Sequence, residues 1–334
     1  MNAEILATDT PALFHAAVGR AAELLRAGEV VALPTETVYG LAANALDARA
    51  VARIFAAKGR PAENPIIVHV AGINMARRCV RQWPRVAQAL ADAFWPGPLT
   101  IVLPRNEIIP DIVTAGGATV GIRWPAHPFI QAVIRQCDFP LAAPSANPSN
   151  TVSPTNAGHV RKTLGTKIPL IVDGGQSQVG IESAVMDLTV CPLQLLRPGM
   201  IHEESLAAVI GKITVGRKGE EPGVVFKSPG QLRKHYSPKA KTMVLKWHDD
   251  ADLAARTQAY PSSACWIIAH TQIPSAEKFA GVSVMPHDAE AFGRALYAEW
   301  HRCDEMGARV IVMEAVPELP EWAGIADRLR RAAG

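Results

Sequence analysis

The chain has 334 residues, enough for about two domains, and its 49% hydrophobic and 19% charged residues indicate a packed globular core rather than a disordered chain. With 34 Lys and Arg against 31 Asp and Glu, the net charge is only +3, which argues against a dedicated nucleic-acid- or membrane-binding protein. Five widely spaced cysteines without a CxxC pair argue against a zinc ribbon and a disulfide framework, and the absence of a long apolar run or a basic leader favours a cytoplasmic protein.

The first 208 residues or so predict one large α/β domain with a mixed sheet. Thr10 and Pro11 begin a helix that ends at Gly28, and Asp47 caps a second helix through Ala57. Two further helices are expected over residues 84–94 and 128–136. The expected strands are short and apolar, and they cover residues 29–33, 66–70, 99–103, 119–123, 141–143, 170–172, 184–188 and 193–196.

Two further regions follow this domain. Residues 211–240 contain several Gly, Pro and Lys residues with little periodicity, so they predict a linker or an extended arm. Strands and helices then alternate three times, which predicts a small three-layer domain with a parallel sheet. Its expected elements are strands over 242–245, 265–269 and 310–313 and helices over 250–257, 288–306 and 321–331.

The chemistry is expected in loops at strand ends, because the sequence has no P-loop, no GxGxxG after a strand and no HExxH. The loop 34-PTETVYGL-41 follows a strand directly. Its hydroxyls either bond to their own backbone in a turn or face a ligand. The loop 58-KGRPAENP-65 holds Lys58 and Arg60 between stiffening prolines. This pair suits an oligophosphate, and the alternative is two cations placed near a helix C-terminus.

Other polar groups accompany these loops. His69 alternates with valines in a strand, which fits a hydrogen-bonded core histidine better than a ligand. Arg123 ends an apolar strand and needs an anionic partner if it is buried. The loop 144-PSANPSNTVSPT-155 has no adjacent basic residue, so a serine nucleophile is not indicated. With Lys58, Arg60 and Arg197, Arg123 predicts a site for a nucleotide or another phosphorylated ligand on a mixed sheet.

Six ordered motifs carry a family resemblance. PTETVYGL, KGRPAENPIIVHV, FWPGPLT, TVGIRWP, APSANPS and LLRPG together resemble the Sua5/YrdC/YciO family, and SPGQLRKHYSP at 228–238 resembles the linker of its long Sua5 type. The family often has Thr at the position of Ala184, and its linker is commonly more regular around Gln231 and Leu232. The resemblance implies a YrdC-like mixed, twisted sheet over 1–210, a linker or lid over 211–240, and a Rossmann-like Sua5 C-terminal domain over 241–334.

The resemblance also implies an activity, that of a threonylcarbamoyl-AMP synthase. Such an enzyme joins L-threonine, bicarbonate and ATP, with Mg²⁺ accompanying the ATP, and releases pyrophosphate. Its product goes to a partner transferase that makes N6-threonylcarbamoyladenosine at position 37 of tRNAs. Direct binding of tRNA is left open. No covalent enzyme intermediate is needed, since the carbamate of threonine attacks the α-phosphorus itself.

Site residues carry over motif by motif. The resemblance places two of them, Lys58 and Arg60, as catalytic cations at the phosphates of ATP. Those expected to bind ATP are Lys58, Arg60, Asn64, Thr119 (through its backbone), Ser145, Asn147, Ser153, Arg197, His235 and Tyr236. Those expected to hold threonine are Thr37, His69, Arg123, Ala143 (through its backbone) and Ser183. No dedicated metal ligands are expected.

The linker carries a separate hypothesis. It has too little apolar periodicity to form a domain, yet it contains the polar aromatic pair His235-Tyr236. We expect it to close over the ATP site and exclude water from the labile adenylate, with the C-terminal domain as its anchor. The alternative is a linker that merely packs along the surface.

Two rival functions remain from the sequence. One is an RNA-binding protein of YrdC-like fold without synthase activity, against which the low net charge argues. The other is a carbamoyl-adenylating domain of the kind found in hydrogenase maturation factors, which carry zinc-finger cysteines that this chain lacks.

Overall fold

A computed structural model describes residues 2–216 and 237–334 and divides them into two compact units. The first unit contains residues 2–149 and 153–216. The second contains residues 150–152 and 237–334.

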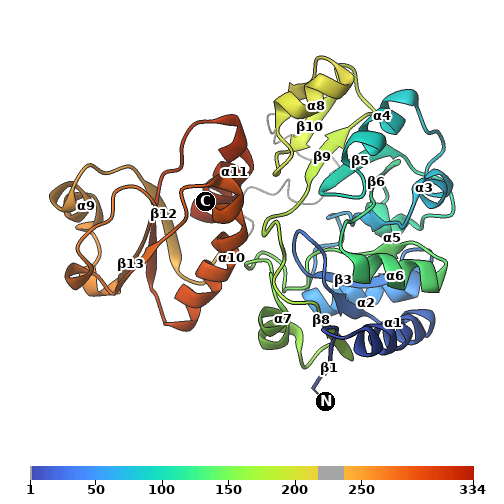
Figure 1. Cartoon of the computed structure of the whole chain (residues 1–334), viewed down its shortest axis with the longest axis horizontal. Coiled ribbons are helices and arrows are strands. Elements are labelled where there is room, and N and C mark those ends of the chain that lie inside the picture. Colours follow the sequence, from blue (N-terminus) through green and yellow to red (C-terminus); the bar gives the residue numbers. More distant parts are fainter. Residues whose placement is uncertain (1, 217–236) are drawn as a thin grey trace. The chain divides into compact units, whose positions relative to one another are not determined.

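The first unit is built on a mixed sheet that, within the described residues, has eleven strands in the order β1-β8-β2-β3-β7-β4-β6-β5-β9-β10-β11 (Figure 1). The sheet contains both parallel pairs (β1/β8, β2/β8, β4/β6, β5/β9 and β10/β11) and antiparallel pairs (β2/β3, β3/β7, β4/β7, β5/β6 and β9/β10). The strands are β1 (Glu4–Ala7), β2 (Val31–Leu33), β3 (Gly40–Asn44), β4 (Val68–His69), β5 (Leu99–Pro104), β6 (Thr119–Arg123), β7 (Leu141–Ala142), β8 (Leu170–Asp173), β9 (Ala184–Asp187), β10 (Gln194–Arg197) and β11 (Thr214–Val215).

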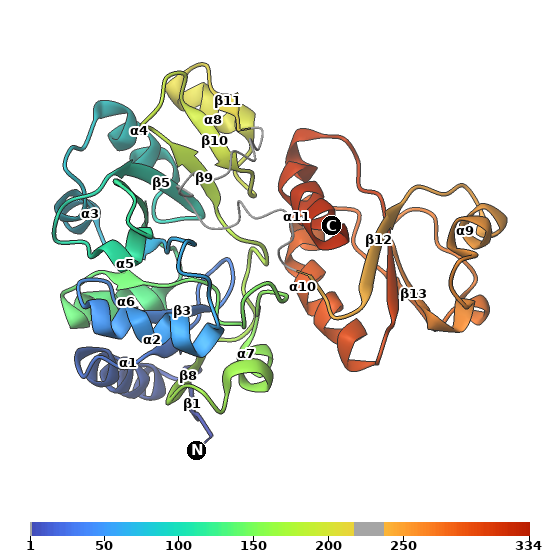
Figure 2. The same ribbon diagram turned by 180° about the vertical axis from the view of Figure 1, so that it is seen from behind.

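Helices cover both faces of this sheet, and each face has its own apolar core. Successive residues of β2 point to opposite faces, as strand geometry requires: Val31 and Leu33 pack with α1 and α6, whereas Ala32 joins the core on the other face. Helices α1 and α6 lie side by side in both ribbon views (Figures 1 and 2). The helices are α1 (Pro11–Arg26), α2 (Ala48–Lys58), α3 (Ile73–Cys79), α4 (Arg85–Phe94), α5 (Asp111–Thr114), α6 (Pro128–Cys137), α7 (Ala157–Leu164) and α8 (Glu203–Ile210).

The helix ends follow local sequence signals. The Thr10 side chain accepts a hydrogen bond from the Leu13 amide, and Asp47 accepts from the amides of Arg49 and Ala50, so both predicted N-caps are confirmed. Helix α2 stops at Gly59, whose φ of +60° is a left-handed conformation that favours glycine. This stop is what starts the loop carrying Arg60.

Several elements were not predicted. Strand β3 begins at Gly40, inside the stretch interpreted as a loop, because an Ala-rich run between two turns has no clear alternation. Edge strand β1 and the short helices α3, α5 and α7 were missed for similar reasons, and β11 falls in the stretch interpreted as a linker. The predicted strand over 66–70 is shorter in the structure, where only Val68 and His69 form β4.

The second unit is a four-stranded parallel sheet with strand order β12-β15-β13-β14. Its connections run in opposite directions across the sheet, from β12 to β13 through α9 and from β14 to β15 through α10. Right-handed crossovers therefore place α9 on one face and α10 with α11 on the other, as both ribbon views show. The elements are β12 (Lys241–Leu245), α9 (Asp250–Thr257), β13 (Cys265–Ala269), β14 (Gly281–Val284), α10 (Ala289–Glu305), β15 (Val310–Glu314) and α11 (Ala323–Ala333).

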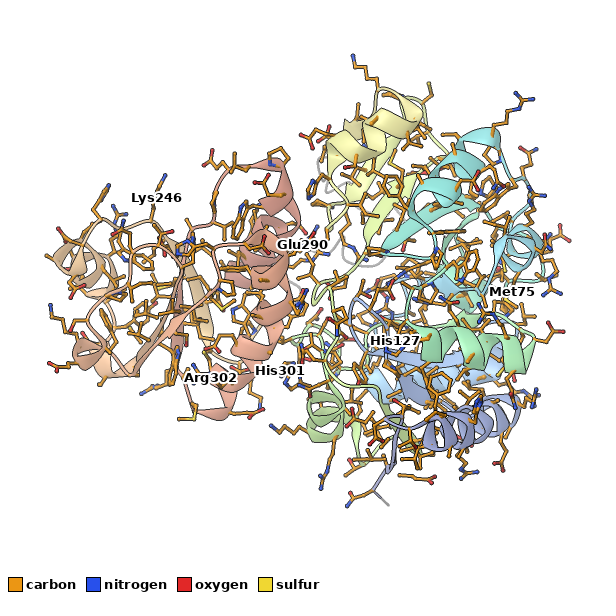
Figure 3. All side chains as sticks on the ribbon, in the orientation of Figure 1. Met75, His127, Lys246, Glu290, His301 and Arg302 are labelled. Atoms are coloured by element: carbon orange, nitrogen blue, oxygen red, sulfur yellow. The ribbon has the colours of Figure 1, made fainter. Side chains whose placement is uncertain are left out.

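The predicted Rossmann-like arrangement of the C-terminal domain is thus confirmed, with β14 as an added edge strand. Figure 3 shows the side chains filling the space between sheet and helices, with Arg302 on α10. The Arg302 guanidinium stacks over the Trp266 ring at 4.8 Å and pairs with Glu299 at 2.6 Å. Within the part of the chain that the structure describes, no helix is long and apolar enough to cross a membrane.

Candidate active site

Three loops of the first unit are joined through their backbones. They are the loop after β2 (34–40), the loop after β7 (143–149) and the segment leading into β9 (177–183). The Val179 and Gly180 amides donate to the carbonyls of Glu36 and Thr37, and the Ala146 amide donates to the Tyr39 carbonyl. Because the loops hold one another, the polar side chains on them are fixed before any ligand arrives.

The first group of side chains contains the two cations predicted for phosphate. Lys58, the last residue of α2, is buried and donates from Nζ to the carbonyls of Ser145 and Asn147. Arg60 donates from Nε to the Asn64 carbonyl at 3.0 Å and from Nη2 to the Pro65 carbonyl at 2.6 Å. These two hydrogen bonds hold the loop 58–65 together, in addition to the prolines that the sequence predicted to stiffen it.

Burial, and secondarily the neighbouring Arg60 charge, lowers the pKa of Lys58 well below its usual value. An anion next to the ammonium group would favour the charged form again. The cation pair is therefore matched to an anionic ligand, and an oligophosphate satisfies both groups at once.

The second group surrounds Arg123 at the end of β6. Its Nη1 donates to Thr37 Oγ1 at 2.9 Å, its Nε donates to the Gly97 carbonyl at 3.3 Å, and its Nη2 lies 2.6 Å from Glu36 Oε1. The sequence predicted that a buried arginine here needs an anionic partner. That partner is Glu36, a residue of the PTET loop that sequence reasoning did not assign.

Glu36 stays ionised. Burial alone would raise its pKa, but Arg123 and backbone amides outweigh burial and hold the pKa below its usual value. The resulting pair is nearly neutral as a whole, and Glu36 carries carboxylate oxygens without a hydrogen-bond donor of good geometry in the described residues. A zwitterion with one positive and one negative group suits such a pair.

His69, next to Arg123 in the β4–β6 register, is buried and neutral. Burial and then the Arg123 charge lower its pKa to about 3. Its Nδ1 has no hydrogen-bond partner among the described residues. A backbone hydrogen bond with Ile67 supports the core-histidine interpretation for the imidazole, whereas the buried Nδ1 atom is not accounted for by it.

The third group lies where β9 begins. Arg197 donates from Nε to the Ser183 carbonyl at 3.0 Å and from Nη2 to Ser183 Oγ at 3.2 Å. Gly199 permits this approach, since a Cβ there would lie 2.4 Å from the Ala184 nitrogen. Ser153 Oγ donates to Glu182 Oε1 at 2.6 Å. Sequence reasoning missed Glu182, although it adjoins Ser183.

The remaining predicted residues fall beside these groups or outside the described chain. Asn64 is buried in the Arg60 loop, and Thr119 begins β6, where it pairs with Pro104 of β5. The Ala143 amide donates to the Ile67 carbonyl, so a ligand contact through its backbone has to use the carbonyl group. The aromatic pair His235-Tyr236 and the lid hypothesis lie outside the described residues.

The chemistry of the site is that of binding and charge neutralisation. Within residues 2–216 and 237–334 no group of three or more His, Cys, Asp or Glu side chains could hold a metal ion. The buried cations and hydroxyl groups fit an anionic, phosphate-bearing ligand next to a small polar one, within an α/β protein.

The comparisons with known proteins narrow this class. A family model for Sua5/YciO/YrdC proteins, described as "Telomere recombination", matches residues 23–199, and one described as "Threonylcarbamoyl-AMP synthase, C-terminal domain" matches residues 201–334. Threonylcarbamoyl-AMP synthase of Pyrococcus abyssi is 40% identical over 326 residues, covering 94% of this chain and 93% of that protein. The Bacillus subtilis protein of the same name is 38% identical over 326 residues, covering 95% and 93%.

A solved structure agrees over both units. The crystal structure of P. abyssi Sua5 complexed with L-threonine matches with a TM-score of 0.89 at 37% identity, covering 99% of this chain and 97% of that one. The chain belongs to the Sua5/YciO/YrdC family, and within it to the long, two-domain Sua5 type.

The buried, neutral His69 predicts an acid-sensitive fold. Its pKa of about 3 lies below the unfolded value, so the unfolded state binds the proton more readily and stability falls as the pH drops below about 6.5. Between pH 7 and 5 the free energy of unfolding of His69→Gln is expected to fall by about 2 kcal/mol less than that of the native protein. Urea unfolding at both pH values measures this, and equal falls would contradict the neutral assignment.

Proposed function

We propose that this protein is an L-threonylcarbamoyladenylate synthase, which forms threonylcarbamoyl-AMP, pyrophosphate and water from L-threonine, bicarbonate and ATP. The observation that carries the proposal is the placement of two groups against the interlocked loops. Lys58, next to Arg60, bonds to the loop after β7, and Arg123 bonds to Thr37 of the loop after β2, in a chain that matches such synthases over both domains.

The proposed division of labour follows from charge. Lys58, Arg60 and Arg197 bind the phosphates of ATP, where negative charge grows on the departing pyrophosphate. Arg123, Thr37, His69 and Ser183 hold threonine. The threonine amine and bicarbonate give a carbamate, whose oxygen attacks the α-phosphorus while the bond to pyrophosphate breaks. Positioning two reactants in this way can contribute ~7 kcal/mol or more to catalysis.

The proposed reaction uses Mg²⁺ as a complex with ATP. Mg²⁺ is proposed to arrive bound to the phosphates of ATP, as it usually does in phosphoryl-transfer sites. The adenylate is labile, and we propose that it passes to a threonylcarbamoyl transferase that modifies tRNA.

One experiment tests the activity. The purified full chain is incubated with ATP, Mg²⁺, bicarbonate and labelled threonine, and the adduct is identified by mass spectrometry while pyrophosphate is quantified. Pyrophosphate release that requires both threonine and bicarbonate supports the synthase. RNA binding without such release would instead favour the RNA-binding alternative.

The amino-acid selectivity of the site is a further prediction. Serine keeps the hydroxyl group and loses only the contact of one methyl group, so its kcat/KM is expected to be lower by roughly 5- to 10-fold. Valine keeps the shape but leaves buried polar atoms without a partner, so it is expected to react at least ~100-fold less efficiently. Competition assays with the three amino acids measure this, and equal use of valine and threonine would show that the hydroxyl group is not recognised.

A further inference from the structure

Thr100 is a polar residue inside the apolar strand β5, in the FWPGPLT motif to which no role has yet been given. It is fully buried, and its Oγ1 lies 2.8 Å from Ser183 Oγ. This is the hydrogen bond that the structure gives to its hydroxyl group. Burying a hydroxyl group in an apolar strand is costly unless the group is hydrogen-bonded. Its partner, Ser183, therefore indicates why a threonine is present in this strand.

The neighbouring strands fix the direction of this side chain. Strand β5 lies between β6 and β9. On the β6 side stands Gly121, where a Cβ would lie only 3.1 Å from the Thr100 methyl group. The methyl group therefore occupies the space that glycine leaves, and the hydroxyl group faces Ser183 just before β9. A β-branched side chain held in this way has a single rotamer.

Hydrogen-bond donors and acceptors then decide where the Ser183 proton goes. Arg197 Nη2 donates to Ser183 Oγ at 3.2 Å, and a guanidinium group cannot accept. Either hydroxyl group could be the donor across the 2.8 Å contact, but Thr100 Oγ1 has no other hydrogen bond in the described residues, so its proton is used only when it donates to Ser183 Oγ. Both lone pairs of the Ser183 oxygen are then used. The Ser183 proton is then free to point away from both residues, and Ser183 becomes a donor to a third group.

Thr37 is not ordered in the same way. The Thr35 hydroxyl group donates to the Val38 carbonyl at 2.6 Å and accepts from the Thr37 and Val38 amides at 3.2 and 3.3 Å, so its proton and both its lone pairs are used. Thr37 Oγ1 accepts from Arg123 Nη1, and its 2.9 Å contact with Thr35 Oγ1 does not fix the direction of the Thr37 proton.

We propose that Thr100 is a positioning residue that directs the Ser183 hydroxyl proton toward a negatively charged oxygen of the bound amino-acid substrate. The proposal rests on the proposed function through the assignment of Ser183 to threonine. Thr100 itself does not touch the substrate.

The test is a mutant cycle read by direct binding. Thr100→Val has nearly the same shape but no hydroxyl group, and it is expected to raise the Kd for L-threonine roughly tenfold, as is typical when one partner of a buried hydrogen bond is removed. Thr100→Ser keeps the hydroxyl group and should bind threonine almost normally. In a Ser183→Ala background, Thr100→Val should change the Kd by less than about twofold, because the group it positions is gone.

Controls separate positioning from a loss of packing. Thr114→Val removes another buried threonine hydroxyl group of the same unit, one that bonds to carbonyls of Asp111 and Gly117, and it should leave the Kd for threonine unchanged. The Kd for ATP, measured in the same full-length variants, should stay constant in Thr100→Val. If Thr100→Val does not fold, Thr100→Ala, which only deletes atoms, takes its place in the cycle with the same expected results.

Three results would each overturn the proposal: equal effects of Thr100→Val with and without Ser183, failure of Thr100→Ser to restore binding, or equal weakening of ATP and threonine. Calorimetry measures the binding of L-threonine to the native full chain without requiring the synthase reaction, so this test is independent of the activity assay. A chain that binds threonine with the expected cycle but forms no adduct would contradict the synthase and leave the role of Thr100 intact.

Discussion

Replacing Arg60 with alanine is expected to lower the rate of threonylcarbamoyl-AMP synthesis by at least ~100-fold, because a charged contact that strengthens in the transition state is typically worth about 3 kcal/mol. The Arg60 fork is already oriented by its bonds to the carbonyls of Asn64 and Pro65. No reorganisation is then needed as charge develops on the departing pyrophosphate. Pyrophosphate release under saturating substrates measures the effect.

Two variants sharpen this result. Arg60→Lys keeps the charge but loses the planar fork, so an intermediate rate is expected. Arg53→Ala removes an exposed arginine of α2, the helix that precedes the Arg60 loop. Arg53 pairs with Glu29, and the variant should be nearly as active as the native protein. A near-normal rate for Arg60→Ala would support the alternative interpretation of Arg60 as a charge placed at the end of α2.

Local signals explain which elements could be predicted from the sequence. Each of the helices α1, α2, α9 and α10 has a capping side chain and an apolar face that can be recognised in the sequence. Their ends fall within about one residue of the prediction. Strand β3 could not be found in this way, since Gly40 joins it to the sheet through a partner, Leu33, that only the folded chain supplies. Two-residue strands such as β4 are likewise defined by their neighbours.

The same distinction holds for the site. Lys58 and Arg60 could be proposed from their spacing, because one short stiff loop carries both. The partners that complete the site come from far along the chain: Glu36 reaches Arg123 and Thr100 reaches Ser183 only when the sheet is formed. A polar residue in an otherwise apolar strand, as in Leu99–Leu103, is the signal that could have identified Thr100. The charge of Glu36 inside a loop of hydroxyl residues is the corresponding signal for Arg123.

Arg123 has two roles that one double variant can separate. Arg123→Met leaves the buried Glu36 carboxylate without its cation, so the free energy of unfolding is expected to fall by about 3–5 kcal/mol. Arg105→Met is the matched control. The Arg105 partner, Asp111, is largely exposed, so loss of this pair should cost less than about 1 kcal/mol. Denaturant unfolding at pH 7 compares them.

The double variant Arg123→Met/Glu36→Gln also removes the Glu36 carboxylate charge, which the single variant leaves buried without a cation. Most of the lost stability should return, because a neutral amide is far cheaper to bury than an unpaired carboxylate. Threonine use should not return, and kcat/KM for threonine is expected to stay at least ~100-fold below that of the native protein, since the guanidinium group that we propose to hold the substrate is absent. A double variant that regains threonine use would show that Arg123 only compensates Glu36. A single variant as stable as the native protein would show that Glu36 does not depend on Arg123.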